Sequence, residues 1–199
     1  TQGNVMESLV QLDRTVTLWI NQTTPPALNG FWHFMSGVRE WIPLYVLVLV
    51  FLFVRLGWKK ALAVTLTLVL GLVLTDQLAN LVKDSVMRLR PCRDLWMINH
   101  GVVCPNGMIG GLYGFYSGHS ANTFAFAAGS WAGLQLNDRK HRYGWYGWLL
   151  LAWATLVAVS RVMLAAHYVG DILVGCLAGL ALGYVLAYAV HRLLVKARL

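Results

Sequence analysis

The stretch DILVGCLAGLALGYVLAYAV, residues 171–190, is an apolar run with one charged residue, at its first position. An α-helix needs about 20 such residues to cross the hydrocarbon core of a bilayer. Four further runs predict spans of the same kind: residues 41–56, 61–82, 120–136 and 145–163. The chain is 58% hydrophobic and only 12% charged, whereas soluble domains carry about 25% charged residues. We therefore expect an all-α integral membrane protein with about five transmembrane helices.

Two segments of the chain differ from these runs. Within residues 1–40, positions 5–20 place apolar side chains at helical spacing but also include Asp13 and Arg14, so the segment is too polar to span. We expect an amphipathic helix that lies on the membrane interface. Residues 83–116 form a long polar segment in which short helices are expected. Both segments are assigned to a single membrane-embedded domain over residues 1–199.

The basic residues between the spans predict the orientation of the chain. They form three clusters: Arg55, Lys59 and Lys60; Arg139, Lys140 and Arg142; and Arg192, Lys196 and Arg198. Five spans place all three clusters on one face, which the positive-inside rule assigns to the cytoplasm together with the C-terminus. We expect a multi-pass protein of the inner (plasma) membrane, with residues 83–116 on the periplasmic or outer face.

Glycines recur at every fourth position of two runs: Gly175, Gly179 and Gly183 in one, Gly129 and Gly133 in the other. Small residues at this spacing let helices approach closely. We expect packing between helices, either within the monomer or between monomers.

Three cations stand beside the outer ends of the predicted spans. Lys83 and Arg90 are seven residues apart, so a continuing helix would place both on one face. Arg161 ends another span. Arginine presents a two-pronged donor to phosphate, and lysine a point charge. A single arginine here would be interpreted as an interfacial anchor, but three cations together with two histidines favour a phosphate site.

The two histidines have different neighbours. His167 and Asp171 are four residues apart, and a carboxylate bonded to one imidazole nitrogen leaves the other nitrogen available as a nucleophile. Taken alone, this pair would be interpreted as a structural hydrogen bond. Ser117, Gly118 and His119 open another span, where a helix start binds anions and the histidine could act as a general acid.

Other polar residues near these motifs are less specific. Asp76 and Asn80 share a helical face with Lys83 and could hold it in place, or form a simple interhelical hydrogen bond. Arg88 and Arg93 flank the motifs and could recognise a second phosphate or a sugar headgroup, but for each of them a solvated loop charge is the favoured interpretation. Two cysteines of the outer segment could form a disulfide in an oxidising compartment or remain free thiols, and the predicted topology favours the disulfide: Cys92 and Cys104.

The spacings Lys-x6-Arg-Pro, Ser-Gly-His and Ser-Arg-x5-His-x3-Asp resemble the signature of the type 2 phosphatidic acid phosphatase (PAP2) family, which shares its site with vanadium haloperoxidases. The resemblance covers about residues 60–195 and departs from the family at Tyr116, where proline is usual. The matched positions are Lys83, Arg90, Pro91, Ser117, Gly118, His119, Ser160, Arg161, His167 and Asp171.

The resemblance implies a PAP2-type helical bundle and a mechanism without metal or cofactor. His167 would attack phosphorus to form a phosphohistidine, Asp171 would orient it, and His119 would protonate the leaving group. The resemblance further implies that five groups stabilise the charge of the transition state: Lys83, Arg90, Arg161, Ser117 and Gly118.

The implied function is a membrane lipid phosphatase, a phosphoric monoester or diphosphate hydrolase acting at the outer leaflet. Isoprenoid diphosphates such as undecaprenyl diphosphate rank slightly first on family frequency, followed by phosphatidylglycerophosphate or phosphatidic acid and the phosphates of lipid A. A lipid phosphotransferase using the same phosphohistidine and a non-catalytic lipid-binding protein remain alternatives. The expected partners are a phosphorylated membrane lipid and the membrane, not nucleic acid, and the oligomeric state stays open.

Overall fold

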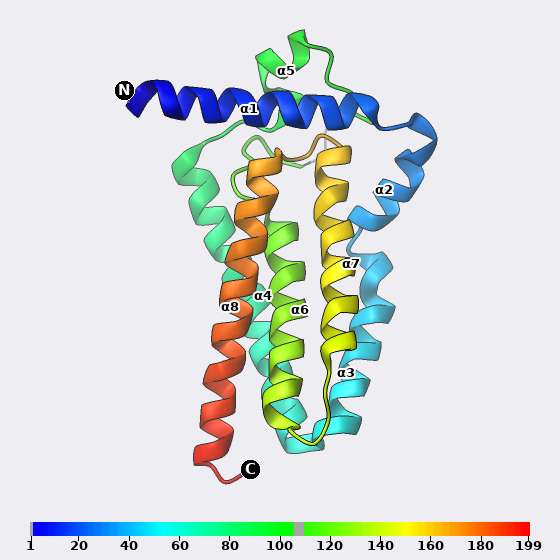
Figure 1. The fold of residues 1–199 in the computed structure, drawn as a ribbon, viewed down its shortest axis with the longest axis vertical. Coiled ribbons are helices and arrows are strands. Elements are labelled where there is room, and N and C mark those ends of the chain that lie inside the picture. The colour runs from blue at the N-terminus through cyan, green and yellow to red at the C-terminus, as the bar shows by residue number, and fades with distance from the viewer. Residues whose placement is uncertain (1, 106–109) are drawn as a thin grey trace.

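Long helices run side by side in a bundle, and a further long helix lies across one end of it (Figure 1). The computed structural model describes residues 2–105 and 110–199. The long helices of the bundle are α3 (Ile42–Leu56), α4 (Trp58–Val86), α6 (Gly118–Asn137), α7 (Gly144–Met163) and α8 (Val169–Lys196). The crossing helix is α1 (Gln2–Thr23), and shorter helices are η1 (Pro26–Leu28), α2 (Asn29–Ser36), η2 (Arg39–Trp41), η3 (Pro91–Arg93) and α5 (Leu95–Asn99).

Each of the five predicted spans corresponds to one helix of the bundle. By length and composition, α4, α7 and α8 could cross a membrane, and the segment from η1 to α3, bent by 64°, could be a fourth crossing. Helix α6 does not meet this criterion, and most of its side chains are buried among the other helices. Because protein rather than lipid surrounds α6, its sequence can be more polar. The all-α membrane fold is confirmed, and the count of five spans stays a prediction.

The glycines of α8 pack against the backbone of α6. A Cβ atom added to Gly179 would lie 2.3 Å from the carbonyl oxygen of Ala121, and one added to Gly175 would lie 2.6 Å from that of Ser117. Real Cβ atoms do not approach oxygen so closely, so only glycine allows this helix separation. The predicted close packing is confirmed within the monomer, and it brings the first turns of α6 and α8 together.

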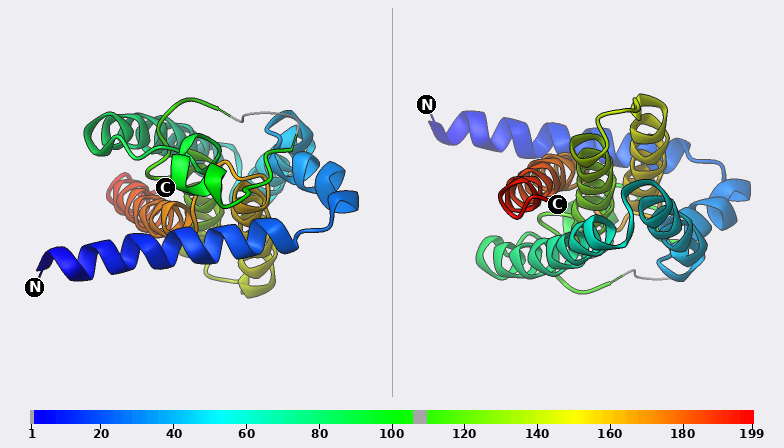
Figure 2. Two further views of the ribbon diagram at one scale, coloured as in Figure 1. Left: turned by 90° about the horizontal axis from the view of Figure 1, so that it is seen from above. Right: turned by 90° about the horizontal axis from the view of Figure 1, so that it is seen from below.

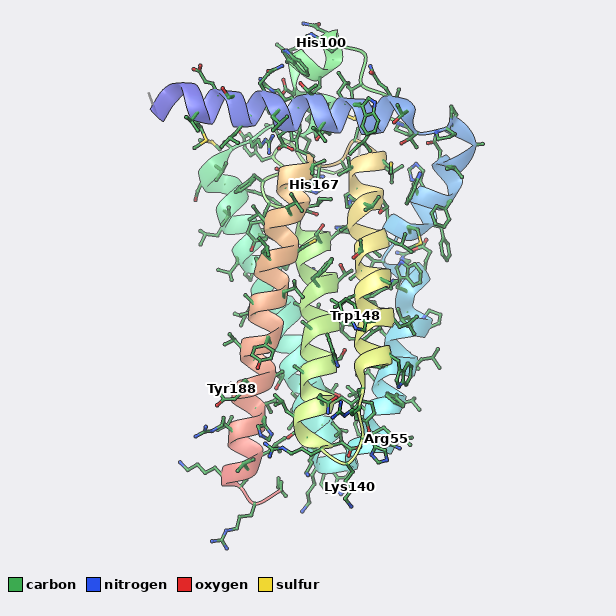
Figure 3. All side chains as sticks on the ribbon, in the orientation of Figure 1. Arg55, His100, Lys140, Trp148, His167 and Tyr188 are labelled. Carbon is green, nitrogen blue, oxygen red and sulfur yellow. A yellow bond between two sulfur atoms is a disulfide. The ribbon has the colours of Figure 1, made fainter. Side chains whose placement is uncertain are left out.

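The basic loops and the motifs lie at opposite ends of the bundle. Figure 3 places Arg55 and Lys140 at one end and His167 at the other. Two of the three basic clusters meet at a cavity of about 640 Å³, whose walls include Arg55, Lys60, Arg139 and Lys140. This separation agrees with the orientation inferred from the loop charges. Which end faces the cytoplasm stays a prediction.

Helix α1 crosses the end of the bundle that carries His167 (Figures 1 and 2). Its polar side chains attach it there: Thr17 Oγ1 accepts from the backbone N–H of Val169 at 3.1 Å. Asn21 donates to the carbonyl oxygens of Val103 and Met163 at 2.9 and 3.2 Å. The apolar residues of its other faces remain exposed: Val5, Met6, Leu9, Leu12 and Trp19. This amphipathic pattern suits an interfacial helix.

Candidate active site

The histidine and aspartate of the third motif meet where α7 turns into α8. His167 follows α7, and its backbone N–H donates to the carbonyl oxygen of Arg161 at 3.1 Å. Asp171 lies in the first turn of α8, and its Oδ2 accepts from the backbone N–H of Tyr168 at 3.0 Å. His167 Nδ1 lies 3.5 Å from Asp171 Oδ2, which is long for a hydrogen bond. The two residues do not share a helix, because α8 begins only at Val169.

This pair is shielded from solvent. The side chains of His167 and Asp171 are 2% and 0% exposed. Burial lowers the pKa of His167 to about 4, although the Asp171 carboxylate acts in the opposite direction. The imidazole is therefore neutral around pH 7, which is the form that a nucleophile requires.

Lys83 stands in the last turn of α4. Its Nζ donates to Asn80 Oδ1 at 3.2 Å, and Asn80 donates to Asp76 Oδ2 at 3.4 Å. Of the two interpretations of Asp76 and Asn80, the structure agrees with the one in which they hold Lys83, because both bonds lie within α4. The helix does not continue to Arg90, because α4 ends at Val86, so Lys83 and Arg90 do not share one helical face.

Arg90 reaches the site from the loop after α4. Its guanidinium donates to the carbonyl oxygens of Tyr113 and Ala166 at 3.1 and 3.4 Å. Arg161 comes from the last turn of α7, is almost fully buried and donates to Ser36 Oγ of α2. The charges of Lys83, Arg90 and Arg161 all act on His119, so the structure gathers the predicted cations around this histidine.

Ser117 connects the second motif to the third. Its backbone N–H donates to the carbonyl oxygen of Asp171 at 3.0 Å. As the N-cap of α6, Ser117 Oγ accepts from the N–H and the hydroxyl of Ser120 at 3.3 and 3.0 Å. A hydroxyl accepts twice and donates once, so one hydrogen remains for a ligand oxygen. A Cβ atom on Gly118 would lie 3.6 Å from Lys83 Nζ, which places the first motif beside the second.

Gly114, which the sequence analysis did not select, shows how close the groups are. A Cβ atom there would lie 3.1 Å from Arg90 Cγ, 3.3 Å from Asp171 Oδ2 and 3.5 Å from His167 Nδ1. The three residues therefore surround one point of the backbone. A larger side chain at position 114 would push against all three residues, which explains why a glycine fits here.

The structure contradicts the interpretation of Arg88 as a solvated loop charge. The NH1 atom of Arg88 lies 2.8 Å from Asp171 Oδ1, and its NH2 atom lies 2.7 Å from Asp13 Oδ2. Its guanidinium also lies over the ring of Tyr168, 3.8 Å from the centroid. Nothing in the local sequence around Arg88 identifies Asp13, 75 positions away, as its partner.

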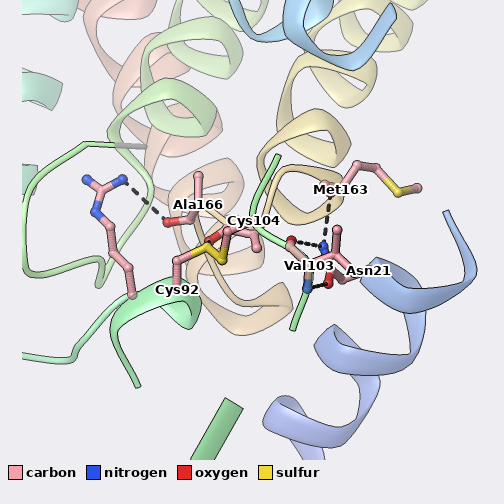
Figure 4. Close-up of a disulfide and its surroundings, with 8 residues drawn as sticks. Asn21, Cys92, Val103, Cys104, Met163 and Ala166 are labelled. Carbon is pink, nitrogen blue, oxygen red and sulfur yellow. Dashed lines mark hydrogen bonds between the residues drawn. A yellow bond between two sulfur atoms is a disulfide. The ribbon is translucent and has the colours of Figure 1, made fainter. Parts of the chain in front are cut away.

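The segment between α4 and α6 is crosslinked beside the site. Cys92 and Cys104 form a disulfide with Cα atoms 6.1 Å apart. Figure 4 shows this bond next to Ala166, with Asn21 of α1 bonded to Val103 on the far side. The segment is thus held both to itself and to α1. Among the described residues, no three His, Cys, Asp or Glu side chains gather closely enough to hold a metal ion.

Comparison with known families agrees with this arrangement. A sequence model of the PAP2 superfamily matches residues 60–194, which include all three motifs. The chain belongs to the PAP2 superfamily. It is therefore a PAP2 membrane lipid phosphatase, that is, a phosphoric monoester hydrolase.

Two curated PAP2 relatives are lipid A 4′-phosphatases. The protein of Porphyromonas gingivalis is 30% identical over 180 residues, which cover 90% of this chain and 73% of the relative. The protein of Bacteroides thetaiotaomicron is 30% identical over 193 residues, which cover 96% of this chain and 83% of that relative.

Two solved structures share the fold. The PAP2-type phosphatidylglycerolphosphate phosphatase of Bacillus subtilis has a TM-score of 0.67 at 22% identity, covering 95% of this chain and 87% of that one. Aquifex aeolicus LpxE has a TM-score of 0.56 at 22% identity, and the match covers 86% of this chain and 92% of LpxE.

Proposed function

We propose that this PAP2 phosphatase removes the 4′-phosphate of lipid A or of a closely related phosphorylated saccharide lipid at the outer leaflet. The observation that carries the proposal is the pair of lipid A 4′-phosphatases that align with nearly the whole chain at 30% identity. Lipid A phosphates were among the substrates expected from the motifs. The initial preference for an isoprenoid diphosphate has no support from these relatives.

The proposed first step is phosphoryl transfer to His167. Its Nε2 attacks phosphorus while the bond from phosphorus to the sugar oxygen breaks, and His119 donates a proton to that oxygen. Asp171 faces Nδ1 at 3.5 Å, which keeps Nε2 available for the attack. The products of this step are the dephosphorylated lipid and a phosphohistidine.

The second step is hydrolysis. His119, now neutral, takes a proton from water as the water oxygen attacks phosphorus and the bond from phosphorus to His167 breaks. Inorganic phosphate leaves, and both histidines return to their starting forms. The outer end of the bundle, opposite the basic loops, is the proposed periplasmic face.

The cations suit a monoester because such a phosphate carries a charge of about −1.5 to −2 near neutral pH. Lys83 is bonded to the neutral amide of Asn80, and Arg161 to the hydroxyl of Ser36. Neither of these bonds neutralises the cation, so both can stabilise the charge that develops on the phosphoryl oxygens.

A substrate panel tests the proposal. Purified protein in mixed micelles with EDTA is given lipid A, undecaprenyl diphosphate or phosphatidylglycerophosphate, and phosphate release and lipid mass are followed. We expect loss of the 4′-phosphate from lipid A, reduced by about 10³-fold or more in His167→Gln. His100→Gln, a change at an exposed histidine near the same end of the molecule, should behave as wild type.

Preferential release of phosphate from another lipid of the panel would overturn the assignment of lipid A as the substrate. Phosphate recovered on a second lipid instead of in solution would overturn hydrolysis in favour of phosphotransfer.

A further inference from the structure

A chain of charges runs from the crossing helix to the proposed nucleophile. Asp13 of α1 contacts Arg88 at 2.7 Å, and Arg88 contacts Asp171 at 2.8 Å. Asp171 in turn faces His167 at 3.5 Å. The side chains of Asp13 and Arg88 are only 16% and 21% exposed, so water screens these contacts weakly.

Each member of the chain is fixed by a second contact. Asp13 Oδ1 accepts from the backbone N–H of Gly170, the residue before Asp171, at 2.8 Å. Arg88 rests on the ring of Tyr168. A Cβ atom on Gly170 would lie 2.7 Å from Asp13 Oδ2, so a larger residue there would displace the Asp13 carboxylate. The carboxylate of Asp171 cannot rotate without breaking its bond to Arg88.

The order of charges also matters. A lone arginine beside Asp171 would neutralise much of the negative charge that the carboxylate presents to His167. Asp13 shares the same guanidinium through its other nitrogen. The three groups together keep a net negative charge, which preserves the attraction of Asp171 for a positively charged imidazole and for an N–H at Nδ1.

We propose that Arg88 and Asp13 are positioning residues for the phosphohistidine chemistry, and that α1 is part of the catalytic apparatus rather than only a membrane anchor. The inference rests on the proposed function of His167 as nucleophile. Neither residue touches the phosphoryl group. Both act through Asp171, by holding its orientation and its charge.

Kinetics with purified lipid A as substrate give the first test. Asp13→Asn and Arg88→Gln should each lower kcat about tenfold or more, with KM changed less than about twofold, as for groups that orient an active histidine. Asp13→Glu should recover part of the loss. The double variant should be no slower than Arg88→Gln, because loss of Arg88 already disconnects Asp13.

Asn21→Ala is the matched control for simple docking of α1. Asn21 makes three hydrogen bonds from α1 to Val103 and Met163, but none to Asp171 or Arg88. Its kcat should stay within about twofold of wild type. Equal losses in Asn21→Ala and Asp13→Asn would overturn the positioning role, as would a wild-type kcat in Asp13→Asn.

A second readout does not depend on turnover. In protein labelled with ¹⁵N-histidine in detergent micelles, the ring signals assigned through His167→Gln should shift in Asp13→Asn and not in Asn21→Ala. Unshifted His167 signals in Asp13→Asn would overturn the inference even if lipid A were not the substrate. Shifted signals in a protein that releases no phosphate would contradict the proposed function, while they would still show that Asp13 acts on His167 through Arg88 and Asp171.

Discussion

At the scale of single residues, the burial of His167 has a consequence for stability. Its pKa in the folded protein is about 4, below its ordinary value of 6.5. The unfolded chain therefore binds this proton more readily between pH 6.5 and 4, so the free energy of unfolding falls as the pH falls through this window. At pH 5 the loss from this group amounts to about 2 kcal/mol.

We accordingly predict that the melting temperature of the wild type drops more between pH 7.5 and pH 5 than that of His167→Gln, which has no proton to gain. Thermal unfolding in detergent at the two pH values measures the difference. Equal drops in both proteins would show that His167 is not held neutral by burial.

At this scale, the spacing of the motifs predicted which side chains the fold brings together, and their catalytic roles stay predictions. The structure brings Lys83, Arg90, Arg161, His119 and His167 to one end of the molecule, as their motifs indicated. The role of Arg88 was not predictable, because its partner Asp13 belongs to a distant helix. Only the folded structure shows that Arg88, which lies between Lys83 and Arg90 in the sequence, is paired with Asp13 and Asp171.

At the scale of helices, the contact between α6 and α8 sets the distance between the motifs. Gly179→Ala would place a methyl group 2.3 Å from the carbonyl oxygen of Ala121. Because this neighbour is backbone, the helices must move apart, and we expect a loss of about 1–3 kcal/mol. The melting temperature and the specific activity should fall together.

The matched control is Gly144→Ala at the start of α7, where an added Cβ would meet nothing within 4 Å. This change should leave stability equal or slightly raised, since alanine is the better helix former. If both variants melted alike, close packing of α6 on α8 would not be what holds the motifs together.

The helix ends were harder to predict than the helices. Helix α4 stops at Val86, and Met87 adopts a left-handed conformation with φ of 50°, its N–H bonded to the carbonyl oxygen of Lys83. Glycine usually fills this position, and a methionine there gives no sign of a helix end. The sequence therefore did not show whether the helix continues from Lys83 to Arg90, and the structure has a helix followed by a loop.

At the scale of the whole molecule, the basic residues of the loops and the cations of the motifs lie at opposite ends of the bundle. Basic residues of the α3–α4 and α6–α7 loops line a cavity at one end, and the site with its crossing helix occupies the other (Figure 3). The hydrophobic runs predicted the helices of the bundle, and the loop charges predicted the separation of the ends. They did not indicate that α6 is surrounded by protein, because a run of moderate polarity resembles a span.

We propose that the end of the bundle beneath α1 transfers a phosphoryl group through His167. The measurement is mass spectrometry of protein mixed briefly with lipid A and quenched in alkali, which preserves phosphohistidine. We expect a phosphoryl group on the wild-type peptide that contains His167 and none on the same peptide of His167→Gln. Phosphate released by the wild type with no phosphorylated peptide at any time point, or with the label on another residue, would contradict it.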